Sequence, residues 1–235
     1  MRVLGEQALT MDKYTSSDRL FLLIHAKSGN LMRFGIVKKV AKAVSPVIRM
    51  NVAFAFLLEK AVHNYMRKLA HEVNIKYHTG LIACQVPAHV SLKQPFAVSD
   101  LDRIEAYFDT LGASIKPFAM DLPRVALSED RSVLWLEVAE TIALRGLHNR
   151  LNHELTEQFG ATNAQCDGDD YRFHATIAQL SQATGASMEL NQEKWLNSPV
   201  GFRSRVTELA MFYNKSSNAR TGQFTTYKIV SLGGS

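Results

Sequence analysis

Two short segments of the sequence combine a histidine with a hydroxyl residue at the same spacing. They are His89-Val90-Ser91-Leu92 and His174-Ala175-Thr176-Ile177, one in each half of the chain. In a β-strand, side chains at positions i and i+2 point to the same face, so each strand would present an imidazole and a hydroxyl together. The intervening aliphatic residues would then face an apolar core.

Two histidines and two hydroxyls facing one another suit phosphoester cleavage without a metal. A neutral histidine can take a proton from water or a ribose hydroxyl, while a protonated one donates a proton to the leaving oxygen. The hydroxyls of Ser91 and Thr176 would hold the non-bridging phosphate oxygens. Because these roles need one histidine in each charge state, we expect a bell-shaped dependence of rate on pH.

Three further residues lie beside these motifs and are candidates for substrate binding. Lys93 shares the His89 face by the same period of two, and Arg172 shares the His174 face, with Tyr171 next to it. Each could contact the phosphate or the rest of the substrate. The alternative for Lys93 is a solvated lysine at a strand end. The remaining histidines lack the spacing of a zinc site, so we expect no metal and no cofactor.

Hydrophobic periodicity predicts the elements that would position these motifs. Strands and helices alternate in two similar halves without a linker, which indicates an α+β fold with largely antiparallel sheets. The predicted strands are 50–58, 82–86, 89–96, 114–127, 132–139, 171–180, 205–213 and 223–232. The predicted helices are 61–73, 101–112, 141–159 and 189–196. Ser99 or Asp100 would cap the second of these helices.

Length and composition limit the possible classes of protein. A chain of 235 residues with 46% hydrophobic and 21% charged residues fits one globular domain, which we place at residues 50–232. No apolar run approaches the roughly 20 residues of a membrane-spanning helix. With two cysteines that lack nearby partners and no secretory signal pattern, we expect a cytoplasmic protein.

The basic character of the chain lies in its first 49 residues. They carry nine Lys and Arg against three Asp and Glu. We treat 1–49 as a basic extension, with a short strand at 19–24 and an amphipathic helix at about 36–45. Residues 33–48 could contact an anionic membrane or nucleic acid, or the helix could pack on the core with a solvated charged face. Residues 233–235 are predicted to be a flexible tail.

The two motifs resemble those of the two-histidine (2H) phosphoesterases, which include bacterial 2'-5' RNA ligase and cyclic phosphodiesterase relatives. The segments PAHVSLKQPF and YRFHATIAQL are similar to that family's paired His-x-Thr/Ser strands, and the likeness covers about residues 50–232. It implies two pseudo-symmetric lobes around a central cleft, with His89, Ser91, His174 and Thr176 at the catalytic positions. The chain departs from the pattern in having Ser91 where Thr is usual and an additional 49 residues in front.

The resemblance implies a metal-independent phosphodiesterase that acts on 2',3'-cyclic phosphates or 2'-5' linkages of RNA or small nucleotides. We expect it to be a monomer. A 2'-5' RNA ligase activity at the same site is the alternative within enzymes. A non-catalytic module that binds RNA or nucleotides, and a protein anchored to a membrane surface through 33–48, are the alternatives from other classes. The residues do not choose the physiological substrate.

Overall fold

A computed structural model describes residues 11–16, 19–24, 50–160, 164, 167–181, 185, 188–196, 198–214 and 224–233. It divides the chain into two compact units, residues 1–45 and 46–235. In the first unit β1 (Met11–Ser16) pairs antiparallel with β2 (Arg19–Ile24), which confirms the strand expected at 19–24. The helix predicted at 36–45 and the tail beyond Gly233 lie outside the described residues.

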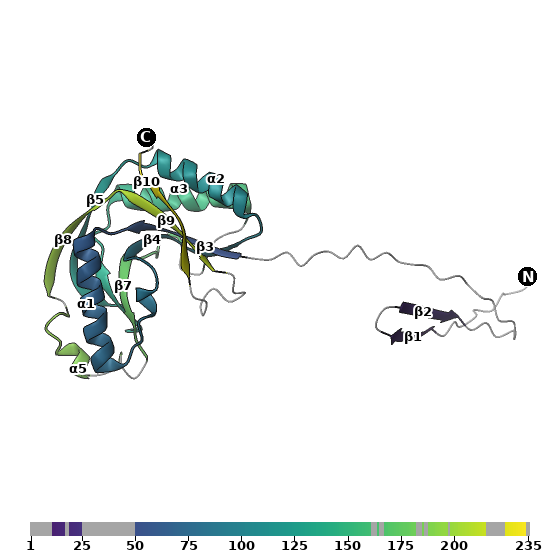
Figure 1. Cartoon of the computed structure of the whole chain (residues 1–235), viewed down its shortest axis with the longest axis horizontal. Coiled ribbons are helices and arrows are strands. Elements are labelled where there is room, and N and C mark those ends of the chain that lie inside the picture. The colour runs from purple at the N-terminus through teal and green to yellow at the C-terminus, as the bar shows by residue number, and fades with distance from the viewer. Residues whose placement is uncertain are drawn as a thin grey trace, which may run out of the picture. The chain divides into compact units, whose positions relative to one another are not determined.

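The second unit contains two four-stranded sheets with helices against them, as Figure 1 shows. Strand order is β10-β9-β3-β4 in one sheet and β7-β6-β5-β8 in the other, and all these neighbours pair antiparallel. The α+β class with antiparallel sheets is therefore confirmed. In chain order the elements are β3 (Met50–Leu57), α1 (Lys60–Tyr77), the 3-10 turn η1 (Ile82–Cys84), β4 (His89–Val98), α2 (Leu101–Ser114), β5 (Phe118–Leu127), β6 (Val133–Glu137), α3 (Ile142–Phe159), β7 (His174–Gln179), α5 (Met188–Asn191), β8 (Pro199–Val206), β9 (Glu208–Asn214) and β10 (Thr225–Ser231).

Helices α2 and α3 begin at side-chain caps that the sequence contains. The Asp100 carboxylate accepts a hydrogen bond of 3.0 Å from the backbone N–H of Arg103 at the start of α2. The Thr141 hydroxyl accepts one of 3.1 Å from Leu144 at the start of α3. Each cap satisfies one of the N–H groups that a first helical turn leaves without a partner.

Two predicted strands differ from the structure. The apolar run at 82–86 forms the turn η1 instead of a strand, because the Arg67 side chain bonds the carbonyl oxygens of Ala83 and Val86 that a sheet neighbour would otherwise occupy. The strand predicted at 205–213 is interrupted at Thr207. Its first part ends β8, which pairs with β5, and its second part is β9, which pairs with β3. The chain thus changes sheets at this point.

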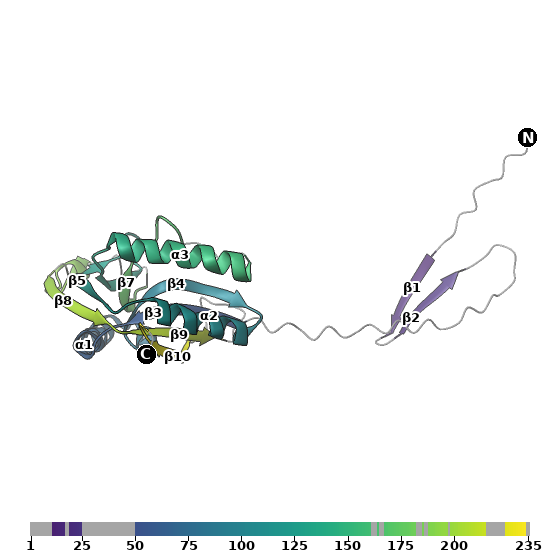
Figure 2. The same ribbon diagram turned by 90° about the horizontal axis from the view of Figure 1, so that it is seen from above.

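Each half of the unit contributes a helix to the other half's motif strand. Helix α1 packs against β7, and α3 packs against β4, as Figure 2 shows for α3. Residues of both sheets and of α1, α2 and α3 form one continuous hydrophobic core. Because the two halves share this core, α3 can bring polar groups to the strand that carries the first motif. No helix in the described segments is long and apolar enough to cross a membrane.

Candidate active site

The first motif lies at the beginning of β4. Its burial alternates as expected: Val90 and Leu92 are fully buried, whereas His89 and Ser91 are half-buried on the opposite face. The pairing of β4 with β3 places Leu57 opposite His89 and Ala55 opposite Ser91. The imidazole and the hydroxyl therefore share one face of the sheet.

The second motif lies at the beginning of β7 and has the same arrangement. Ala175 and Ile177 face the core, and His174 and Thr176 are half-buried on the other face. The pairing of β7 with β6 places Trp135 opposite Thr176. Both predictions of which side chains share a face are confirmed at the level of strand geometry.

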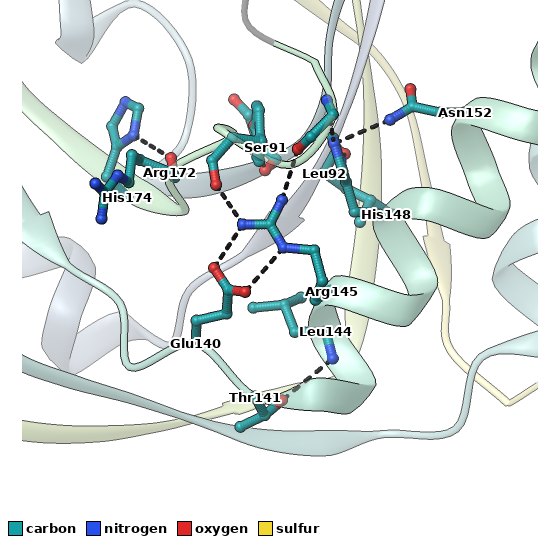
Figure 3. A network of polar contacts seen from close by, with 12 residues as sticks. Ser91, Leu92, Glu140, Thr141, Leu144, Arg145, His148, Asn152, Arg172 and His174 are labelled. Carbon is teal, nitrogen blue, oxygen red and sulfur yellow. Dashed lines mark hydrogen bonds and ion pairs between the residues drawn. The ribbon is translucent and has the colours of Figure 1, made fainter.

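Each motif histidine is oriented by the carbonyl group two residues before it. The His89 Nδ1–H donates to the Pro87 oxygen at 2.8 Å. The His174 Nδ1–H donates to the Arg172 oxygen at 2.7 Å, as Figure 3 shows. A carbonyl oxygen can only accept, so Nδ1 carries the proton in both rings. The Nε2 atoms are therefore the ones able to accept or donate a proton in a reaction.

Burial holds both imidazoles neutral at ordinary pH. It lowers the pKa of His89 from 6.5 to about 4, against the bond to Pro87, and the charges of His174 and Arg67 lower it further. Burial also lowers the pKa of His174, opposed by the bond to the Arg172 carbonyl. The charge of a protonated His174 is thus among the causes that lower the pKa of His89.

The surroundings of the two rings differ. The His89 ring meets Phe212 edge-on, with centroids 4.7 Å apart. The His174 ring lies against the half-exposed Trp135, with centroids 4.4 Å apart and an interplanar angle of 31°. The Trp135 indole therefore lies beside the second motif. The strand period could have revealed this, since Trp135 alternates with the buried Leu134 and Leu136.

Sequence analysis did not identify Arg67 as a site residue. Its side chain extends from α1 to the carbonyl oxygens of Ala83 and Val86, and its charge contributes to lowering the pKa of His89. Its neighbour on α1, the half-buried His63, accepts a hydrogen bond of 3.2 Å from the Ala88 N–H. No local pattern distinguishes Arg67 from the other basic residues of α1.

Two of the three predicted substrate-binding residues lie in the interior. Lys93 is fully buried, and its ammonium forms an ion pair with Asp167, so neither an open phosphate ligand nor a solvated strand-end lysine describes it. A bulge in β4 at this point shifts Lys93 off the face of His89. Tyr171 is also buried, and its hydroxyl donates to the Ser91 carbonyl at 2.8 Å.

Arg172 is the predicted substrate-binding residue that remains exposed. It precedes β7 instead of lying within it, so its place beside the second motif does not follow from strand alternation. It lies 3.6 Å from Glu129 and borders a groove of about 1040 Å³. The groove also includes Trp135 and adjoins the second motif through that indole.

The groove carries more acidic than basic side chains. Its charged lining residues are Arg124, Glu129, Asp130, Glu137, Glu140, Asp170 and Arg172. Both arginines lie against carboxylates, Arg124 with Glu137 and Arg172 with Glu129. The groove therefore has a net negative charge. Among the described residues, no group of three His, Cys, Asp or Glu could hold a metal ion.

Comparisons with known proteins agree with this fold. The family model of the 2'-5' RNA ligase superfamily matches residues 59–218. The fold is similar to TT0787 of Thermus thermophilus (TM-score 0.56, 17% identity, covering 78% of this chain and 98% of that one). It is also similar to E. coli LigT complexed with NADP+ (TM-score 0.52, 18% identity, 79% and 99%). A comparison with curated protein sequences gave no match.

Proposed function

The chain belongs to the 2'-5' RNA ligase superfamily, the two-histidine phosphoesterases, and we propose that it is a metal-independent phosphodiesterase. Its substrates are 2',3'-cyclic phosphates or 2'-5' linkages of RNA or small nucleotides. The observation that carries the proposal is the pair of electrostatically coupled imidazoles, His89 and His174, each held through Nδ1 with Nε2 left for proton transfer. A hydroxyl residue lies two positions after each of them.

In this proposal, His89 is the general base and His174 the general acid. The His89 Nε2 takes a proton from water as the water oxygen forms a bond to phosphorus. The bond from phosphorus to the ribose oxygen breaks, and His174 Nε2–H gives its proton to that oxygen. The lower pKa of His89 supports its role as the base. The negative phosphate of a bound substrate would raise the pKa of His174 and favour its protonated form.

Ser91 and Thr176 would donate hydrogen bonds to the non-bridging phosphate oxygens, where negative charge is held during the reaction. Both lie on the same strand faces as the histidines. Arg172, exposed beside the second motif, is a candidate contact to the rest of the substrate. Lys93 and Tyr171 have no such role in the proposal because both are buried.

The acidic groove beside Trp135 supports a small nucleotide substrate over a long RNA. A chain of phosphates entering this groove would meet an excess of carboxylates. A base without a phosphate could stack on the Trp135 indole instead. Ligation of RNA at the same site would use the same two histidines with acid and base exchanged.

The test is turnover of 2',3'-cyclic mononucleotides and of an RNA that ends in a cyclic phosphate, in the presence of EDTA. We expect activity in wild type and a loss of about 10²- to 10⁴-fold in His89→Ala and in His174→Ala. His71→Ala, at an exposed position of α1, is the matched control and should retain full activity. Binding without turnover in wild type would favour a binding module, and activity lost in EDTA would exclude the metal-independent mechanism.

A further inference from the structure

Two backbone carbonyl groups of the first-motif strand are held by side chains from the second half of the domain. The Tyr171 hydroxyl donates to the Ser91 oxygen at 2.8 Å, and the His148 Nδ1–H donates to the Leu92 oxygen at 2.8 Å. The rings of Tyr171 and His148 are stacked, with centroids 4.2 Å apart and an interplanar angle of 17°. Each ring therefore restricts the movement of the other.

The next residue of the same strand is held by an ion pair. The Lys93 ammonium bonds the Asp167 carboxylate, which also accepts a hydrogen bond of 2.8 Å from the Ala164 N–H. Neither side chain of the pair is more than 1% exposed. Three consecutive residues of β4, beginning two positions after His89, are thus bonded to groups outside their own sheet.

The segment that supplies these groups leads directly into the second motif. Arg145 of α3 donates to the carbonyl oxygens of Gly168 and Tyr171, and Glu140 holds the guanidinium through two hydrogen bonds (Figure 3). The Arg172 carbonyl that follows orients the His174 ring. A continuous set of polar contacts therefore connects the first motif to the second.

His148 contributes a further bond to this segment. Its Nδ1 donates to β4, so its Nε2 carries no proton and accepts from the Gly168 N–H at 3.4 Å and from the Asn152 amide at 2.9 Å. Burial lowers the pKa of His148, which keeps the ring neutral in this arrangement. A protonated ring could not accept these two bonds.

Directional bonds serve a different purpose here from apolar packing. Hydrophobic contacts are non-directional and would tolerate small shifts of one strand relative to the other. A buried ion pair adds little net stability compared with apolar side chains of similar size, so its presence calls for another explanation. The bonds to Ser91, Leu92 and Lys93 restrict sliding of β4 along its own axis. The shared core restricts movement of β4 away from its neighbours.

We propose that Lys93, Asp167, His148 and Tyr171 form an inter-strand clamp that sets the distance and orientation between His89 and His174. The clamp residues are positioning residues, since their side chains are buried. The inference rests on the proposed function, in which both imidazoles act on one phosphate. A misplacement of about 1 Å can cost on the order of 10²-fold in rate, so clamp variants lower kcat more than they raise KM.

The first test compares two variants that each remove one hydrogen-bonded tyrosine hydroxyl. Tyr171→Phe removes the bond to Ser91 and keeps the ring stacked on His148. Tyr107→Phe is the control, because its hydroxyl bonds Glu154 at 2.7 Å and bonds no carbonyl group of a motif strand. We expect kcat to fall about 10-fold in Tyr171→Phe alone, with KM changed less than about threefold and similar thermal midpoints in the two variants. Equal kcat values would overturn the clamp.

The second test replaces the ion pair by apolar side chains. The double variant Lys93→Met with Asp167→Leu removes both charges, which retains stability better than removing one partner. Lys228→Met is the control, since Lys228 pairs with Glu105 and Asp109 on the surface between α2 and β10. We expect a loss of about 10- to 100-fold in kcat in the folded double variant and none in the control. A folded double variant with wild-type kcat would contradict the proposal.

A third measurement does not depend on turnover and separates failure of the clamp from failure of the proposed function. In wild type, His174→Ala removes a charge that lowers the pKa of His89, so this pKa rises in an NMR titration. In the clamp double variant we expect the same substitution to change the pKa of His89 less, because the rings are farther apart. An unchanged coupling would overturn the clamp even if no tested phosphoester is a substrate.

Discussion

The two motifs share their local geometry and differ in what surrounds them. Both histidines begin a strand, bond the carbonyl two residues earlier and have a hydroxyl residue two positions later. His89 meets the edge of Phe212 and the charge of Arg67, whereas His174 lies on Trp135 next to an acidic groove. The same strand geometry therefore gives the two imidazoles different surroundings, and in the proposed mechanism these surroundings distinguish the base from the acid.

The largest expected effect separates these two roles by pH. If His89 is the base, kcat/KM of wild type rises with pH through the pKa of His89, and falls at higher pH as His174 loses its proton. Because burial lowers both pKa values below 6.5, the optimum for the free enzyme lies on the acidic side of pH 6.5. The residual rates of His89→Ala and His174→Ala should be about 10²- to 10⁴-fold lower than that of wild type. The pH profile of His89→Ala should lack the rise at low pH, and that of His174→Ala should lack the fall at higher pH. Loss of the same limb in both would remove the distinction.

The next effect concerns Trp135, the aromatic residue that lies against His174 in the second motif. Trp135→Leu should raise KM for a cyclic mononucleotide about 10-fold, because base stacking is worth roughly 1–3 kcal/mol, and should lower kcat less. Trp195→Leu is the control, since Trp195 is half-buried away from both motifs, near α5. Steady-state kinetics at fixed pH decides the matter. Equal KM values in the two variants would show that no base rests on Trp135.

A smaller effect should come from the charge of the groove. The double variant Glu129→Gln with Asp170→Asn removes two negative charges, so kcat/KM for an oligonucleotide with a cyclic phosphate end should rise a few-fold relative to a cyclic mononucleotide. Glu208→Gln, an exposed substitution on β9, should leave the ratio unchanged. The ratio is measured at low salt. A fall in the ratio would contradict repulsion in the groove.

Arg67 influences the pKa of His89 in the first motif, so substituting it tests the surroundings of that motif alone. A nearby cation disfavours a second positive charge, so Arg67→Met should raise the pKa of His89 and leave that of His174 unchanged. Lys68→Met, at an exposed position of the same helix, is the control. NMR titration of the two rings provides the measurement. An equal rise at both rings would show that the effect of Arg67 is not local.

The smallest effect is on stability. Between pH 6.5 and about 4 the unfolded chain binds a proton at His89 that the folded chain does not, so stability is present above pH 6.5 and is lost as the pH falls through this window. One pKa unit corresponds to about 1.4 kcal/mol. For this half-buried ring we expect the free energy of unfolding to fall by about 1–2 kcal/mol across this pH window, and to fall by less in His89→Asn. Denaturant unfolding at pH 7 and pH 4.5 measures it, and identical pH dependence in both proteins would refute it.

Most elements could be predicted from the sequence because their signals are local. The capped and apolar-striped α2 and α3 were predicted within a few residues, and the alternation in β4 and β7 correctly placed the imidazoles and hydroxyls on one face. The predictions failed where contacts with residues distant in the chain determine the local structure. Arg67 occupies the carbonyl groups of the η1 turn, and β8 and β9 separate because they pair with strands of different sheets.

Lys93 and Tyr171 show the same limit within the site. Their closeness to the motifs in sequence made them candidates for substrate binding, but the bulge in β4 and the buried Asp167 place Lys93 in the interior. The sequence by itself determined the residue types and the strand period, hence which side chains can transfer protons and which face carries them. Only the tertiary structure decided which imidazole is more strongly desolvated, what lies against each ring and how the motif strands are held together. These properties depend on contacts between residues far apart in the chain, for which a local pattern carries no signal.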